Sequence, residues 1–156
     1  MQRRITALIG IAALSALTLS ACGAPPADGG GGGSGSDFLP CAVSDLTGFD
    51  DKDFNELTYT GVKEAADELG VEPKAAESAS EDQYDSNIAN LVAEDCDLIV
   101  TVGFALANAT RDAAQADPDV NFALIDSVVT NDDFSTLVLD NVKPVLFDTA
   151  QAAVLA

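Results

Sequence analysis

From Phe38 onward, short apolar runs alternate with longer segments in which apolar residues recur at helical spacing. The short runs predict β-strands, and the helical spacing predicts α-helices. Strands are expected at residues 38–44, 74–78, 97–103, 121–126 and 135–140, and helices over 52–69, from 80 onward and over 105–116. Strand and helix alternate about every 20 to 30 residues, the rhythm of right-handed crossovers in a parallel sheet. The pattern therefore predicts a doubly wound α/β layer.

Two of the predicted helices carry end signals. The first helix is expected to stop at Gly70, because glycine tolerates the left-handed conformation that commonly ends a helix. The second is expected to begin with a capping box formed by Ser80 and Gln83. The stripes expected to face the core are Leu57, Gly61, Ala65 and Leu69 in the first helix, and Tyr84, Ile88, Leu91 and Val92 in the second.

The chain before the predicted sheet has the features of an export signal followed by a tether. Residues 1–21 begin with a basic end and continue with an apolar run that is short for a bilayer span, which disfavours a transmembrane helix. The run ends in "LSAC", which resembles the bacterial lipobox, where the chain is cut before the cysteine and that residue, here Cys22, carries lipid. Residues 22–37 are rich in glycine, serine and proline and are expected to form a flexible linker. The protein is thus expected at the extracytoplasmic face of the cell membrane, held by lipid alone; an ordinary cleavable signal with an incidental cysteine is the alternative.

The charge of the chain limits its partners. The formal net charge is −19 at pH 7, from 26 acidic and 7 basic residues. Such a surface repels phosphate backbones, and the sequence lacks the basic patch that nucleic-acid binding requires. Solubility outside the cell explains most of the acidity. The charge still favours a neutral or cationic small ligand over a polyphosphate.

Three cysteines and the absence of histidine limit the possible chemistry. With Cys22 assigned to lipid, Cys41 and Cys96 remain in an exported, oxidising setting, where such a pair is typical of a disulfide. In the common 2-1-3-4-5 strand order both lie at the same edge of the sheet, because the first and third strands are neighbours; two unpaired buried thiols are the alternative. Without histidine, the sequence excludes histidine-ligated metal sites, thiol–imidazole catalysis and the serine–histidine–acid triad. No metal or other cofactor is expected.

Ligands of open α/β sheets bind outside the carboxyl ends of the strands, so the residues that follow the strands are candidate site residues. They are Asp45, Gly103 with Phe104, and Asp126 with Ser127, joined by Phe54 and Asn55 at the start of the first helix. An aromatic face, an amide and two carboxylates suit a heteroaromatic ligand, because the ring stacks while the polar groups pair with a base edge or sugar hydroxyls. No nucleophile stands beside a base in this set, so binding fits better than catalysis. The structural alternatives are Phe54 as a first core residue and Asp50 or Asp51 as helix caps.

Three segments, "VSDLTGFDDKDFNE", "DLIVTVGFALANAT" and "NFALIDS", together resemble the basic membrane protein family of bacterial lipoproteins, also called purine nucleoside receptor A-like. The resemblance extends over residues 38–156 and implies the substrate-binding component of an ABC-type nucleoside importer, with permease subunits as partners. It also implies a type I periplasmic-binding fold, in which the ligand lies between two lobes. Under this resemblance, Phe54 stacks on the base, Asn55 and Asp126 hold the base edge, Asp45 lines the pocket floor, and Gly103 and Phe104 lie at the pocket.

The chain departs from the family pattern in residues and in length. Thr47 stands where glycine is usual, Asp53 where serine is usual, and Pro144 where glycine typically follows the lysine. Residues 38–142 are expected to form the N-terminal lobe, and residues 143–156 the crossover and the start of a truncated second lobe. One lobe alone is expected to bind nucleosides weakly or not at all, because hinge closure requires two. The alternatives are a binding or sensor lipoprotein for a sugar or another small molecule, a non-functional fragment, and an extracellular α/β enzyme.

Overall fold

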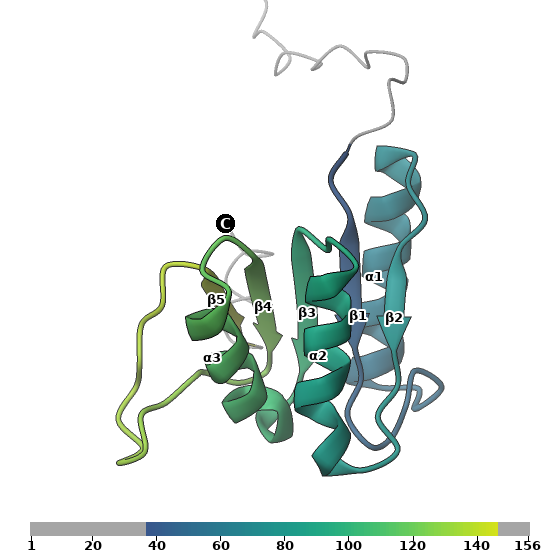
Figure 1. Cartoon of the computed structure of the whole chain (residues 1–156). Coiled ribbons are helices and arrows are strands. Elements are labelled where there is room, and N and C mark those ends of the chain that lie inside the picture. Colours follow the sequence, from purple (N-terminus) through teal and green to yellow (C-terminus); the bar gives the residue numbers. More distant parts are fainter. Residues whose placement is uncertain (1–36, 147–156) are drawn as a thin grey trace, which may run out of the picture. The chain divides into compact units, whose positions relative to one another are not determined.

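The computed structural model describes residues 37–146, which form one parallel sheet with helices on both faces (Figure 1). The strands are β1 (Pro40–Val43), β2 (Lys74–Ala76), β3 (Leu98–Val102), β4 (Asn121–Ile125) and β5 (Val142–Val145), in the order β2-β1-β3-β4-β5. Helix α1 (Phe54–Leu69) covers one face, and α2 (Tyr84–Ala93) and α3 (Ala107–Ala116) cover the other. Single turns of 3-10 helix, η1 (Glu81–Gln83) and η2 (Phe104–Leu106), precede α2 and α3. The predicted doubly wound layer and its strand order are confirmed.

The sheet has a hydrophobic core on each face, because successive residues of a strand point to opposite sides. Val43 and Ile99 belong to the larger core beneath α2 and α3. Ala42 and Val100 belong to the smaller core beneath α1. All four residues of β1 are buried, which explains why a central parallel strand appears as a continuous apolar run.

Cys41 and Cys96 form a disulfide that joins β1 to the turn before β3. Their Cα atoms lie 6.1 Å apart, and both side chains are buried. Cys41 lies opposite Ile99 in the parallel register of β1 and β3, so the strand order brings both cysteines to the same edge of the sheet.

The buried face of α1 differs from the predicted stripe. Leu57 is 72% exposed, and the helix buries Asn55, Val62 and Ala66 instead. The cause is tertiary: Phe49 in the preceding loop is buried and packs on Tyr59 with ring centroids 4.5 Å apart, which places the Tyr59 side of the helix against the sheet. The predicted stop is confirmed, since Gly70 ends the helix with a φ of 73°.

The predicted capping box at the start of the second helix is wrong. Gln83 Oε1 accepts a hydrogen bond from the N–H of Ala79 at 2.8 Å, and Ser80 makes no side-chain capping bond. The intervening residues form η1, so α2 begins only at Tyr84. Of the predicted stripe, Tyr84, Ile88 and Leu91 are buried, while Val92 is partly buried against the core.

The fifth strand lies later in the chain than predicted. Residues 135–140 form no strand of the sheet, and β5 is Val142–Val145, paired in parallel with β4. The apolar character of the earlier segment comes from Leu137 and Leu139, which pack against the core as part of a connection. Pro144 is tolerated because β5 is an edge strand, where a residue without an N–H breaks no ladder bond if it faces outward. The expected lobe boundary at 142/143 therefore divides a strand, and residues 143–145 belong to this sheet.

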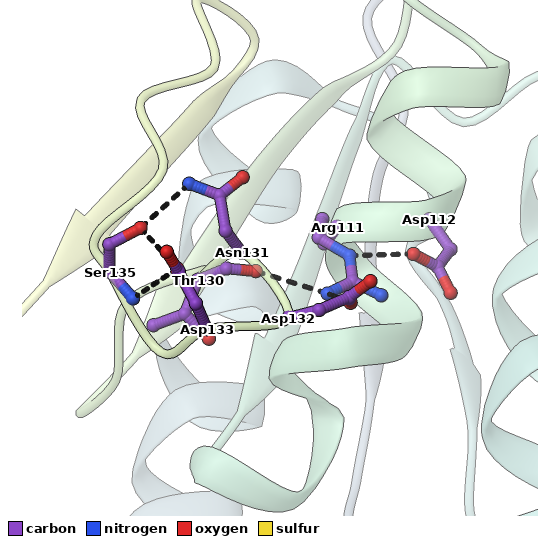
Figure 2. Close-up of polar contacts among 7 residues, drawn as sticks. All are labelled: Arg111, Asp112, Thr130, Asn131, Asp132, Asp133 and Ser135. Atoms are coloured by element: carbon purple, nitrogen blue, oxygen red, sulfur yellow. Dashed lines mark hydrogen bonds and ion pairs between the residues drawn. The ribbon is translucent and has the colours of Figure 1, made fainter.

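Arg111 of α3 holds the long loop between β4 and β5 (Figure 2). Its Nη1 donates to the carbonyl oxygen of Thr130 at 3.0 Å and to Asp132 Oδ1 at 3.3 Å, and its Nε donates to Asp112 Oδ1 at 2.7 Å. The loop folds back between Thr130 and Thr136, which form an isolated antiparallel bridge. A hollow of about 200 Å³ lies beside Arg111, but the guanidinium is already paired with two carboxylates.

Several predictions fall on residues outside 37–146. They concern the signal at residues 1–21, lipidation of Cys22, almost all of the 22–37 linker and the end of the crossover, and they remain predictions. Within residues 37–146, no helix combines the length and the apolar character that crossing a membrane requires.

Removing the disulfide should destabilise the folded domain. The double variant Cys41→Ala, Cys96→Ala is expected to lose about 4 kcal/mol of unfolding free energy, because the bridge closes a long loop and restricts the unfolded chain. Urea denaturation followed by circular dichroism, with and without a reductant, measures the loss. Reduction should bring the wild type to the stability of the double variant and leave that variant unchanged; equal stability of the double variant and the oxidised wild type would contradict the prediction.

Candidate ligand-binding site

A cavity of about 370 Å³ lies at the carboxyl ends of β1, β3 and β4, beside the first turn of α1. All six predicted ligand-binding residues line it: Asp45, Phe54, Asn55, Gly103, Phe104 and Asp126. Thr47, Asp51, Asp53 and Val102 line it as well. The parallel strand order accounts for this convergence, because the segments after β1, β3 and β4 all emerge at the same edge of the sheet.

Two aromatic rings border the cavity. Phe54 is 40% exposed and Phe104 is 84% exposed, so neither ring is a core residue. The alternative that Phe54 serves as the first buried residue of α1 is therefore wrong. An exposed face of a phenyl ring can stack on a flat apolar or heteroaromatic group.

Asn55 is buried, and its amide is fully engaged with the β1–α1 turn. Oδ1 accepts a hydrogen bond from the N–H of Asp45 at 3.2 Å. Three acceptors share the two hydrogens of Nδ2: Asp45 Oδ1 at 2.9 Å, Asp51 Oδ2 at 2.8 Å and Thr47 Oγ1 at 2.9 Å. The two amide hydrogens of Asn55 thus already have acceptors within the protein, and its pairing with a ligand stays a prediction. These hydrogen bonds of Asn55 hold the β1–α1 turn together.

Asp51 caps α1 from within this turn. Its Oδ1 accepts from the N–H groups of Asp53 and Glu56 at 2.9 and 3.0 Å, and its Oδ2 accepts from the N–H of Asn55 at 3.2 Å. Desolvation alone raises the pKa of Asp51, but the hydrogen bonds from the Asn55 side chain and from three backbone N–H groups outweigh it and hold the pKa well below its ordinary value. Of the two capping alternatives, Asp51 is the cap.

Asp45 and Asp126 bring carboxylates to the cavity from the ends of β1 and β4, with β3 between those two strands. Asp45 Oδ1 accepts bonds from the N–H and the hydroxyl of Thr47 and from Asn55, whereas Oδ2 faces Gly103. Asp126 has a positive φ of 55°, and its N–H donates to the carbonyl oxygen of Val145 at 2.8 Å. Within residues 37–146, no hydrogen-bond donor contacts the Asp126 carboxylate. Both carboxylates can accept hydrogen bonds from a ligand.

Tyr84 of α2 lies in the core near Asp45. Its side chain is buried, and its hydroxyl has no well-aligned hydrogen-bond partner within residues 37–146. Burial first, and then the charges of Asp45 and Glu81, raise the pKa of Tyr84. The Tyr84 phenol therefore stays neutral near the carboxylate of Asp45.

The cavity is acidic on its polar side. Four aspartates line it, and its lining includes neither lysine nor arginine. Residues 37–146 contain no cluster of three or more acidic or thiol side chains arranged to hold a metal ion. The site thus favours ligands that donate hydrogen bonds or carry positive charge.

Residues 39–156 match the family model described as ABC transporter substrate-binding protein PnrA-like, or Bmp. The chain belongs to this family. The Bmp family consists of substrate-binding proteins rather than enzymes, in agreement with the binding character expected from the sequence. Its match begins at the first strand of the sheet.

Individual proteins that resemble this chain agree with the match. The ABC transporter nucleoside-binding protein BmpA of Lactococcus lactis is 29% identical over 133 residues, which cover 83% of this chain and 38% of that protein. An uncharacterized lipoprotein of Pyrococcus abyssi is 33% identical over 71% of this chain and 26% of its own length. A solved structure of an ABC transporter solute-binding protein from Aeropyrum pernix K1 aligns with a TM-score of 0.60 and 29% identity, over 70% of this chain and 28% of that one. The chain therefore spans well under half the length of these three proteins.

Two features of the site were not assigned from the sequence. Val102 lines the cavity as the last residue of β3, and Asp51 braces the turn as well as capping the helix. The strand end at Val102 could have been inferred from the strand order. The bond from Asn55 to Asp51 depends on the angle at which α1 leaves the turn, for which the sequence carries no signal.

Removing the cap should cost stability in a pH-dependent way. Asp51→Ala is expected to lower the unfolding free energy at pH 7 by about 1 to 2 kcal/mol, the value of a helix cap. Because the folded-state pKa lies below the unfolded value of 3.8, the contribution is present above that pH and is lost as the pH falls below it. Urea denaturation at pH 7 and pH 3 measures the difference between wild type and variant, which should shrink at pH 3.

Asp50→Ala is the matched control, since Asp50 is exposed and adjacent in sequence, and no hydrogen bond is found to its side chain within residues 37–146. It should change stability by less than about 0.5 kcal/mol. If both variants lost the same unfolding free energy, the capping role of Asp51 would be contradicted.

Proposed function

We propose that this chain is the lipid-anchored, nucleoside-contacting lobe of an ABC transporter substrate-binding protein, and that its ligand is a purine nucleoside. One observation carries the proposal: an exposed aromatic ring, Phe54, stands at a cavity whose polar wall holds the carboxylates of Asp45 and Asp126. The Lactococcus lactis relative, described as nucleoside-binding, supports the choice of ligand. The permease subunits of an importer are the proposed partners, and the extracytoplasmic face of the membrane, reached through lipid on Cys22, is the proposed location.

The rings supply the affinity for the base. Stacking of a base on an aromatic side chain contributes about 1–3 kcal/mol. Phe54 comes from the first turn of α1 and Phe104 from η2, so they approach the cavity from two different elements. A purine offers a larger flat surface than a pyrimidine or a sugar, and stacking therefore favours it.

The carboxylates supply the polar contacts. Asp45 and Asp126 accept hydrogen bonds from amino or ring N–H groups of a base, or from ribose hydroxyls. Asn55 has a supporting role in this proposal, because its amide holds Asp45 in place. The four aspartates of the cavity disfavour a phosphorylated ligand, so a nucleoside is preferred to a nucleotide.

The cavity of residues 37–146 is open on one side, so a ligand there has one face in contact with the protein. In a two-lobed protein, closure of the lobes would cover the other face and raise the affinity. This chain by itself is accordingly proposed to bind nucleosides weakly.

An NMR titration of the chain tests the proposal, because amide shifts detect even millimolar binding. Guanosine and adenosine are expected to shift the amide signals of cavity residues, whereas cytidine and ribose shift them less. Shifts caused equally by ribose would favour a sugar-binding protein of the same fold. Absence of any shift, from a protein shown to be folded, would contradict nucleoside binding by this chain.

Matched variants separate the stacking ring from general effects. Phe54→Leu is expected to weaken binding about fivefold or more, because a leucine side chain cannot stack. Phe134→Leu alters an exposed phenylalanine outside the cavity and should leave the titration unchanged. Asp126→Asn should weaken binding, while Asp119→Asn, at an exposed position outside the cavity, should not. Equal effects within either pair would contradict the assignment of that residue.

A further inference from the structure

The hydroxyl of Thr47 lies inside the polar network of the cavity wall. Thr47 Oγ1 is 2.6 Å from Asp45 Oδ1 and 2.9 Å from Asn55 Nδ2. Its distance to Asp51 Oδ2 is longer, 3.4 Å. The backbone N–H of Thr47 also donates to Asp45 Oδ1, at 2.9 Å. One residue thus contributes two donors to the same carboxylate oxygen.

The single hydroxyl proton determines the direction of these bonds. The amide nitrogen of Asn55 can only donate, so Oγ1 cannot give its proton to Nδ2 and gives it to a carboxylate. The shorter distance identifies Asp45 as the acceptor. Asp45 Oδ1 then receives three hydrogen bonds, from Thr47 N–H, from Thr47 Oγ1 and from Asn55 Nδ2, and its accepting capacity is used within the protein.

The other oxygen of Asp45 has a different environment. Oδ2 faces the backbone of Gly103, where an added Cβ would lie 3.9 Å away. Within residues 37–146, no donor forms a hydrogen bond with it. Both Asp45 and Gly103 line the cavity.

We infer that Thr47 is a positioning and specificity-determining residue of the nucleoside site: its hydroxyl locks the Asp45 carboxylate so that Oδ2 alone faces the ligand. The ligand part of this inference rests on the proposed function. A carboxylate held in one orientation presents a single directed acceptor, which selects a ligand with an amino, ring N–H or hydroxyl donor at that point.

Stability of the fold is a poor explanation for this arrangement. Thr47 is exposed, so water can satisfy its hydroxyl without the contact to Asp45. Charge repulsion gives a reason for holding the Asp45 carboxylate in place. Asp45 and Asp51 accept hydrogen bonds from the same amide nitrogen, so the two carboxylates lie close together and repel each other. The hydrogen bond from the Thr47 hydroxyl to Asp45 Oδ1 offsets this repulsion and keeps the Asp45 carboxylate in its orientation.

The orientation of Asp45 can be measured without any ligand. Three-bond couplings to the Asp45 carboxyl carbon report its χ1 rotamer in the wild-type chain, in Thr47→Val and in Thr47→Ser. Wild type and Thr47→Ser should show one rotamer, and Thr47→Val, which keeps the shape but loses the hydroxyl, should show averaged couplings. Thr60→Val, at an exposed position on α1, controls for the exchange of threonine for valine and should leave the couplings unchanged. Unchanged couplings in Thr47→Val would overturn the inference.

Affinity for guanosine then tests the consequence in a double-mutant cycle with Asp45→Ala. Thr47→Val is expected to weaken binding about three- to tenfold when Asp45 is present, and Thr47→Ser should restore it. In the Asp45→Ala background Thr47→Val should have no further effect, because no carboxylate remains to be positioned. Equal weakening in both backgrounds, or tighter binding by Thr47→Val, would overturn the inference. If the wild type binds no nucleoside, the proposed function fails, while the couplings still decide whether Thr47 orients Asp45.

Discussion

The hydrogen bonds of the Asn55 amide are the interaction on which the site depends. This buried side chain joins Asp45, at the end of β1, to Asp51, the cap of α1, and to Thr47 between them. Without such donors, repulsion between the carboxylates of this turn would favour a more open conformation. The amide supplies two protons and one acceptor at the centre of the turn, and the backbone of Asp45 completes the set. The exposed position of Phe54 follows, because Asn55 takes the inward direction at the start of the helix.

The parallel sheet provides the rest of the site. Its strand order places the ends of β1, β3 and β4 side by side. The segments after these three strands bring Asp45, Phe104 and Asp126 to the cavity. The disulfide between Cys41 and Cys96 lies near the amino ends of β1 and β3, opposite this edge. The disulfide and the cavity thus lie at opposite ends of the strands. The disulfide constrains the sheet and does not line the cavity.

The errors of the sequence-based predictions have a common origin in contacts between distant residues. The stripe of α1 was misplaced because Phe49, outside the helix, packs on Tyr59 and selects the buried face. The fifth strand was misplaced because Leu137 and Leu139 are apolar for packing as part of a connection, while Pro144 sits in the edge strand. The internal hydrogen bonds of Asn55 have the same origin, because its amide lies close enough to donate to both Asp45 and Asp51 only in the folded turn.

The sequence by itself determined the fold class and the residues expected to meet at the carboxyl edge, and it favoured the strand order and the cysteine pairing that the structure has. These follow from apolar periodicity and from the geometry of parallel sheets, which are local or topological properties. Only the tertiary structure decided which hydrogen bonds of the site residues are made within the turn and which polar groups stay open to the cavity. The reason is that a hydrogen bond depends on distances of tenths of an ångström, and Asp45, Thr47, Asp51 and Asn55 reach those distances only when α1 is docked on the sheet.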